Sequence, residues 1–158
     1  VHRLDRDTSG VMVFGLTPHA QRNLSMQFEK RTTKKTYVAR VAGNFEEKTG
    51  TVDLPLIVDW PNRPRQMVGR ETGKPAVTDW RVLKQKDGES RVRLSPKTGR
   101  SHQLRVHMLA LGHPILGDPL YAAGADADFD RMMLHSEELR ISHPENGHGM
   151  TFRAKANF

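Results

Sequence analysis

The sequence predicts a domain of the α/β class, α+β in type, with a mixed and largely antiparallel sheet flanked by a few helices. Between residues 33 and 96, short alternating segments are separated by Pro and Gly, which is typical of strands joined by hairpins. The clear helical signals start at Thr17 and Ser101. At 158 residues and 36% hydrophobic content, the chain can bury a sizeable core, and we expect residues 1–158 to form one domain.

The N-terminal part is predicted to begin with a strand at about 10–16. A helix follows, with Thr17 as its cap and Pro18 in its first position, where the missing N–H costs no hydrogen bond. Apolar residues at helical spacing form the buried stripe of this helix: Ala20, Leu24 and Phe28. Residues 33–43 alternate in character and predict a strand. One face of that strand carries Lys35, Tyr37, Ala39 and Val41.

The remaining chain is predicted to consist mainly of strands. Segments bounded by turn residues predict them near 51–58, 65–70, 76–84, 90–95, 132–142 and 149–154. Residues 59–65, DWPNRPR, form a stiff and basic turn between two of these strands. The segment 101–112 instead predicts a helix, with Ser101 as its cap and Gly112 as the residue that ends it.

The chain is strongly basic, with a formal net charge of +7 and a pI near 10.1. Two stretches, 30–42 and 90–117, each hold five basic residues and no acidic one. One such stretch alone is most simply a solvated surface. Two of them beside a candidate active site favour a surface that binds the phosphates of a nucleic acid.

Composition also restricts the class of protein. The chain has no cysteine, which excludes disulfides and thiolate metal sites and indicates a reducing cytosol, so we expect a cytoplasmic protein. No apolar run is long enough to span a membrane, and we expect no membrane association. The sequence lacks a long amphipathic seam of the kind that forms coiled coils, so we expect no obligate protein partner. Because the chain begins with Val1 instead of Met, directly before a charged motif, we expect a further N-terminal segment to be missing.

Residues 2–10, HRLDRDTSG, are the most informative segment for chemistry. Asp5 lies between Arg3 and Arg6, which favours an ionised carboxylate and suits a nucleophile better than a proton donor. A turn in which the Asp side chain satisfies nearby backbone donors is an equally good interpretation of this pattern. A calcium-binding loop is excluded, because its twelfth position is Leu16 where a bidentate Glu is needed.

Arg105 is predicted to project from the apolar side of the second helix, because Met108 and Leu109 lie three and four residues further on. A buried guanidinium needs a carboxylate partner. Alternatively, the side chain extends along its aliphatic stem to solvent. The sequence offers no acidic residue close to Arg105, so we predict that it forms an ion pair with the distant Asp5.

A metal site is not predicted from the histidines of this region. Histidines that share one face of a helix lie three or four residues apart, whereas His102 and His107 are five apart. Capping, hydrogen bonding in the core or contact with phosphate is the expected role of these residues and of His113.

Four segments, HRLDRDTSG, KKTYVARV, TGRSHQLRVHM and GHPILGDPLY, occur in the order of known family motifs. On these segments the chain resembles the RluA family of pseudouridine synthases. DLPLIVDWPNRPRQ and ETGKPA are similar to segments of one subgroup, which isomerises uridines in ribosomal large-subunit RNA and in tRNA anticodon stem-loops. The resemblance implies the pseudouridine synthase catalytic fold and an RNA isomerase that needs no cofactor.

The resemblance also implies roles for individual residues. Asp5 corresponds to the nucleophile, and Arg105 to the arginine that pairs with it. Tyr37 corresponds to the aromatic residue that stacks on the uracil and is a candidate for helping to remove the C5 proton. Arg3 corresponds to an arginine that fills the space left by the uridine, and Leu134 to a residue of the base pocket. Further residues expected to bind RNA are Lys34, Lys35, Arg100 and His102. A non-catalytic RNA-binding or RNA-folding module on the same scaffold is the alternative.

Overall fold

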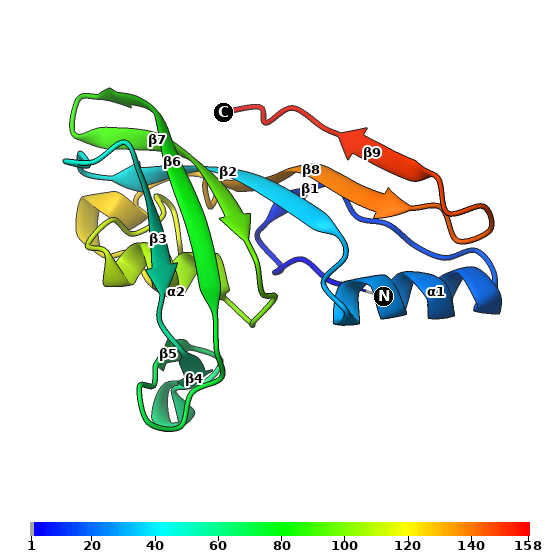
Figure 1. Cartoon of the computed structure of the whole chain (residues 1–158). Helices are drawn as coiled ribbons and strands as arrows, with labels where there is room; N and C mark the ends of the chain where they lie inside the picture. The colour runs from blue at the N-terminus through cyan, green and yellow to red at the C-terminus, as the bar shows by residue number, and fades with distance from the viewer. Residues whose placement is uncertain (1) are drawn as a thin grey trace.

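The computed structural model describes residues 2–158, and a seven-stranded sheet built from these residues crosses the molecule (Figure 1). The strand order is β1-β8-β2-β7-β6-β3, and β9 also pairs with β8. The strands are β1 (Ser9–Gly10), β2 (Lys34–Ala42), β3 (Thr49–Asp53), β6 (Val77–Lys86), β7 (Glu89–Pro96), β8 (Leu134–Ser142) and β9 (Gly149–Arg153). Apart from the parallel pair β1–β8, the pairings are antiparallel. The predicted fold class is confirmed.

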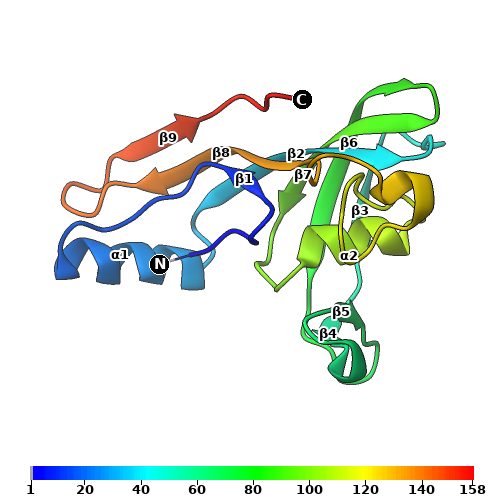
Figure 2. The same cartoon turned by 180° about the vertical axis from the view of Figure 1, so that it is seen from behind.

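The two α-helices, α1 (Pro18–Glu29) and α2 (Gln103–Ala110), lie on the same side of this sheet (Figure 1, Figure 2). A separate two-stranded hairpin, formed by β4 (Leu56–Val58) and β5 (Gln66–Val68), lies beyond α2 on that side. Short 3-10 turns occur at Trp60–Asn62 and Gly124–Ala127. Neither helix within residues 2–158 is long and apolar enough to cross a membrane.

Each helix covers its own part of the sheet with a separate apolar cluster. Under α1, the buried Leu24 packs with Leu139 and Ile141 of β8. Under α2, Leu104 and Met108 belong to the larger core that β2, β7 and β8 share. The clusters do not merge, and the space between the two helices is therefore free to hold polar side chains.

Most of the predicted elements are found within a few residues of their predicted bounds. The first helix starts as predicted, because the Thr17 hydroxyl accepts a hydrogen bond from the Ala20 N–H at 3.1 Å and Pro18 takes the first position. The strand predicted at 51–58 is split into β3 and β4. That residues 1–158 form a single catalytic domain remains a prediction.

The strand predicted at 10–16 is wrong for most of its length. Only Ser9 and Gly10 pair with β8. Beyond them, the Val11 N–H still donates to the Ser136 carbonyl at 2.9 Å, but the Val13 N–H donates to the imidazole of His2. Val11 and Val13 pack on the cluster under α1, so the alternation of apolar residues reflects burial against a helix instead of strand pairing.

The predicted start of the second helix also needs correction. Ser101 does not cap it: His102 is the N-cap residue, in a left-handed conformation with φ 54° and without a capping side-chain bond. The turn is instead held by the buried Gln103, whose side-chain carbonyl accepts from the Arg100 N–H at 3.0 Å and the Thr98 hydroxyl at 2.6 Å. The predicted end is confirmed, since Gly112 follows the helix with φ 84°.

Candidate active site

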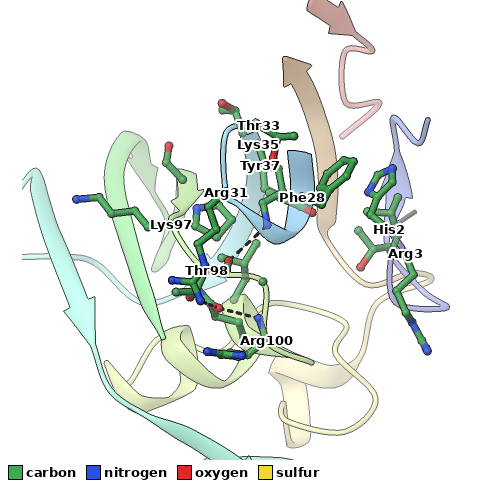
Figure 3. A pocket seen from close by; sticks show the side chains of 18 of the residues that line it. His2, Arg3, Phe28, Arg31, Thr33, Lys35, Tyr37, Lys97, Thr98 and Arg100 are labelled. Carbon is green, nitrogen blue, oxygen red and sulfur yellow. Dashed lines mark hydrogen bonds between the residues drawn. The ribbon is translucent and has the colours of Figure 1, made fainter. Parts of the chain in front are cut away.

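A cleft of about 980 Å³ lies between the C-terminal end of α1 and the N-terminal end of α2 (Figure 3). Its other walls come from the segment before β1, the start of β2, the end of β7 and the loop at residues 97–102. All the site residues predicted from the sequence line this cleft: Arg3, Asp5, Lys34, Lys35, Tyr37, Arg100, His102, Arg105 and Leu134. Segments that are far apart in the sequence therefore meet at one place.

Asp5 is positioned by a tight turn held against the sheet. The Thr8 N–H donates to the Asp5 carbonyl at 3.0 Å, and two residues later Gly10 passes beside Ser136 with φ 120°. A Cβ at Gly10 would lie 2.1 Å from the Ser136 carbonyl oxygen, so only glycine permits this approach. The turn is closed by the backbone carbonyl of Asp5 and not, as the alternative interpretation expected, by its side chain, which is 23% exposed and pairs with Arg105.

His2 anchors the same segment to α1. Its imidazole stacks on Phe28 with the ring centroids 4.4 Å apart and the planes inclined by 9°. Its Nε2 accepts a hydrogen bond from the Val13 N–H at 3.0 Å. Burial, more than any nearby charge, lowers the pKa of His2, which suits a neutral ring that accepts this bond.

The predicted ion pair between Asp5 and Arg105 is present, with 3.2 Å between Nη1 and the carboxylate oxygen. Arg105 has a second and closer partner that the sequence reasoning missed. The guanidinium donates from Nε and Nη2 to the two carboxylate oxygens of Asp118, each at 2.8 Å. Asp118 is fully buried, and it lies in the turn that follows α2. Asp118 lies 13 residues after Arg105, and the sequence analysis did not predict it as a partner.

Asp118 is itself fixed by the backbone. One of its carboxylate oxygens accepts from the N–H groups of Leu120 at 3.0 Å and Tyr121 at 3.2 Å. Burial disfavours the charged guanidinium of Arg105, but the hydrogen bonds and charges of Asp118 and Asp5 outweigh it and raise the pKa of Arg105. The arrangement holds a permanent positive charge against Asp5.

Tyr37 enters the cleft from β2, directly after a shift in the pairing register with β8 at Thr36. Burial and the negative charge of Asp5 raise the pKa of Tyr37 to about 12. The phenol therefore keeps its proton at neutral pH. Its half-buried ring offers a flat surface close to the carboxylate of Asp5, as stacking on a base requires.

Lys35 lies on the same strand and bridges the cleft. Its Nζ donates to the carbonyl of Thr98 at 3.4 Å, which is drawn as a dashed line in Figure 3. Burial, with the charge of Arg31 as a further cause, lowers the pKa of Lys35. The neighbouring Lys34 is exposed, so its ammonium group is accessible to an anion.

Two further predicted residues, Arg100 and His102, are tied to the hairpin side of the cleft. The Arg100 Nε donates to the carbonyl of Pro75 at 2.9 Å. The His102 Nδ1 shares a hydrogen bond of 2.6 Å with the hydroxyl of Tyr121. Burial and the charge of Arg105 lower the pKa of His102, which favours the neutral ring. His102 is thus suited to contact a substrate by hydrogen bonding instead of by charge.

The last two predicted residues differ in exposure. Arg3 is exposed, and its side chain extends away from the centre of the cleft in Figure 3. Leu134, the first residue of β8, is buried and adds an apolar surface to the wall. Their roles toward a substrate remain predictions.

The other histidines of α2 and its turn are used inside the fold. His107 lies between the Thr78 hydroxyl at 2.8 Å and the Leu54 carbonyl at 2.9 Å. His113 bonds the Ala42 carbonyl at 2.7 Å. Across residues 2–158, no group of three or more His, Cys, Asp or Glu side chains is arranged to hold a metal ion.

Acidification is expected to destabilise the fold through histidines that are partly or fully buried. The pKa values of His2, His102 and His107 are all lowered by burial from their ordinary value of 6.5. The unfolded chain therefore binds more protons below about pH 6.5, and stability that is fully present above that pH declines as the pH falls. Urea unfolding should give a lower free energy of unfolding at pH 5 than at pH 7.5.

A matched pair of variants checks this cause. His107→Gln should reduce the difference between the two pH values, because it removes one buried titrating group. His148→Gln, at an exposed histidine, should leave the difference unchanged. An equal pH dependence in the wild type and the His107 variant would contradict the assignment.

Comparisons with known proteins identify similar sequences and a similar fold. The family model described as RNA pseudouridylate synthase matches residues 1–110. The dual-specificity RNA pseudouridine synthases RluA of Yersinia pestis and Escherichia coli are 57% and 59% identical over 160 residues, covering 100% of this chain and 78% and 73% of those proteins. The solved structure of human RNA Pseudouridylate Synthase Domain Containing 1 superposes with a TM-score of 0.90 at 34% identity, covering 99% of this chain and 68% of that one.

Proposed function

The chain belongs to the RNA pseudouridylate synthase family and is a pseudouridine synthase, and we propose that Asp5 is the nucleophile with which it isomerises uridines in RNA. We further propose that it acts on ribosomal large-subunit RNA and on tRNA stem-loops. The names of the relatives, which state dual specificity, support two classes of RNA substrate.

The observation that carries the proposal for Asp5 is its contact with Arg105. The carboxylate is partly exposed to the cleft, while the guanidinium beside it is buried and held by a second carboxylate. A carboxylate attacks carbon in its anionic form, and the fixed positive charge lies where the charge on the reacting group changes.

The isomerisation exchanges one glycosidic bond for another. Asp5 attacks the uridine either at the base or at the anomeric carbon C1′ of the ribose. The N1–C1′ bond breaks, the uracil rotates, and C5 bonds to C1′ in place of N1. The proton of C5 leaves, N1 gains a proton, and the bond to Asp5 breaks again. Since no net oxidation or reduction occurs, the residues need only bind and orient the uridine, form and break the bond to Asp5, and move protons.

Tyr37 is suited to stacking on the uracil in this cleft. Because its pKa is about 12, the hydroxyl is protonated at neutral pH and can accept the C5 proton only while it releases its own proton to solvent. We therefore propose that the hydroxyl acts as a proton relay and the ring as a stacking surface.

Replacing Tyr37 by Phe separates these two roles. The ring remains, so RNA affinity should stay within about threefold of the wild-type value, whereas the single-turnover rate should fall by roughly 10²- to 10⁴-fold. Tyr37→Leu should weaken both binding and rate. A Tyr37→Phe variant that reacts as fast as the wild type would restrict Tyr37 to stacking.

The basic walls of the cleft support a role in holding RNA. The target base must leave its stack to reach Asp5, which costs a few kcal/mol, and contacts with the RNA backbone offset that cost. Lys34, Lys35 and Arg100 supply these contacts, and His102 adds a hydrogen-bonding group. Arg3 takes the place vacated by the base, and Leu134 lines the base pocket. Loops are easier targets than duplexes, because their bases are already partly unstacked.

The proposal is tested with transcripts that carry tritium at C5 of every uridine, because isomerisation releases that hydrogen to water. Tritium release is expected from a ribosomal large-subunit RNA fragment and from tRNA, and sequencing the products maps the modified positions. Release from only one class of RNA would overturn the dual specificity. RNA binding without release from either class would favour the non-catalytic RNA-binding module.

A further inference from the structure

The hairpin lobe, which we define as residues 54–75, carries a strongly exposed aromatic side chain that the catalytic cleft does not explain. It comprises β4, β5 and the 3-10 turn between them, and it lies beyond α2 on the side of the sheet that bears the helices (Figure 1, Figure 2). Trp60 in this turn is 64% exposed. No residue of the lobe lines the cleft.

The exposed indole of Trp60 is held in a defined orientation. The guanidinium of Arg63 lies over its ring at 3.9 Å. The turn beneath is closed by a hydrogen bond from the Asp59 N–H to the Arg65 carbonyl at 2.8 Å, and the Asn62 amide donates to the Asp59 carboxylate at 3.1 and 3.2 Å. A preformed and exposed indole loses little conformational entropy when a ligand stacks on it.

The chemistry of the lobe fits a single-stranded nucleic acid. Exposed cations, Arg63, Arg70 and Lys74, lie in the same lobe as the indole. The lobe has two acidic residues, Asp59 and Glu71, and the carboxylate of Asp59 accepts hydrogen bonds from the Asn62 amide. An aromatic surface on which bases stack, with cations nearby for the phosphates, is the pattern of proteins that bind unpaired nucleotides.

The lobe is also fixed relative to the cleft. The Tyr121 hydroxyl accepts from the Gln66 N–H of β5 at 2.7 Å and bonds His102 in the cleft at 2.6 Å. Leu56 of β4 packs in one apolar cluster with Val106 of α2. These contacts hold the lobe, and Trp60 with it, in place beside the cleft.

We propose that Trp60 and Arg63 form a second RNA-binding site, on which an unpaired base of the substrate RNA other than the reacting uridine stacks. This inference rests on the proposed function, because it takes RNA as the substrate of the cleft. The fixed separation between the two sites selects RNAs whose unpaired bases lie at the matching distance, so the lobe contributes to the choice of target.

Affinity measurements test the inference in the background of Asp5→Asn, which prevents turnover. Trp60→Ala should weaken binding of a fluorescein-labelled tRNA transcript by about 5- to 100-fold, and Trp60→Phe, which keeps a ring, should weaken it by less than about fivefold. Leu16→Ala is the matched control, since Leu16 is 96% exposed and belongs to another surface. Its affinity should equal that of the parent protein.

The chain contains two tryptophans, which allows stacking to be observed directly. In Trp80→Phe, Trp60 is the remaining fluorophore, and the same tRNA transcript should quench its emission with the concentration dependence of binding. If Arg63 and Trp60 only stabilise the turn, Trp60→Ala lowers the melting temperature, leaves the affinity unchanged, and RNA does not quench Trp60. That result overturns the inference.

Failure of this inference is distinguishable from failure of the proposed function. Suppose that the wild type binds and isomerises the transcript, but the transcript does not quench Trp60 and Trp60→Ala does not change the affinity. The lobe is then not an RNA site, and the proposed function stands. If the wild type neither binds nor isomerises the transcript, both are overturned.

Discussion

Asp5→Asn is expected to abolish pseudouridine formation, with a loss in single-turnover rate of at least about 10³-fold, as is usual when a covalent nucleophile is removed. An amide cannot form the bond to carbon that the reaction requires. The replacement has nearly the same size, and Arg105 keeps both hydrogen bonds to Asp118, so the fold should be preserved. Tritium release from C5-labelled RNA measures the effect.

A second aspartate in the segment HRLDRDTSG, Asp7, provides a control for this experiment. Asp7→Asn makes the same chemical change two residues away, at an exposed carboxylate that does not line the cleft. The single-turnover rate of Asp7→Asn should remain within about twofold of the wild-type rate. The RNA affinity of Asp5→Asn should remain within about threefold of the wild-type affinity. Residual activity of Asp5→Asn above about one per cent would contradict the role of Asp5 as nucleophile.

Asp118→Asn is expected to have the largest effect on stability, lowering the free energy of unfolding by about 3–5 kcal/mol, because it breaks a buried ion pair and leaves Arg105 with the partly exposed Asp5 as its remaining carboxylate partner. Asp118 is fully buried and the side chain of Arg105 is 4% exposed, so water cannot replace the lost carboxylate. The backbone N–H groups of Leu120 and Tyr121 also lose an anionic acceptor. Urea unfolding at pH 7.5 measures the change.

A more exposed ion pair serves as the comparison. Glu89→Gln removes the partner of Arg40, where the side chains are 35% and 27% exposed and lie 2.8 Å apart. The cost there should be no more than about 1 kcal/mol, because solvent screens the pair. Equal losses in the two variants would show that the burial of Asp118 does not determine its contribution.

The strands could be predicted from the sequence because their alternation follows directly from burial of one face of the sheet. The same rule misplaced a strand at 10–16, where apolar residues pack under α1 and the Val13 N–H bonds a side chain instead of a strand. Period alone does not distinguish an extended segment that is paired from one that is only buried.

The partner of Asp5 was predictable because the face of a helix is readable from spacing. Arg105 shares its side of α2 with apolar residues, and a buried cation requires an anion. Asp118 was missed because a carboxylate before Pro in a Gly-rich segment has the sequence of an ordinary turn. Its pairing depends on how the chain folds back after α2, which the local pattern does not specify.

The start of α2 was misplaced for a similar reason. Ser101 has the residue type of a cap, but the side chain of Gln103 holds the turn through Thr98 and the Arg100 N–H. These partners come from the preceding loop, and Gln103 becomes their common acceptor only when it is buried.

The shared guanidinium of Arg105 has a consequence for the charge of the core during turnover. In the proposed mechanism, the negative charge of Asp5 disappears when its carboxylate becomes esterified to the substrate. If Asp5 were the sole counter-ion, the buried guanidinium of Arg105 would lose its counter-charge in each catalytic cycle and then regain it. Because Asp118 supplies a permanent counter-charge through Nε and Nη2, only Nη1 faces the changing group. The nucleophile can lose and regain its charge while the interior stays electrically balanced.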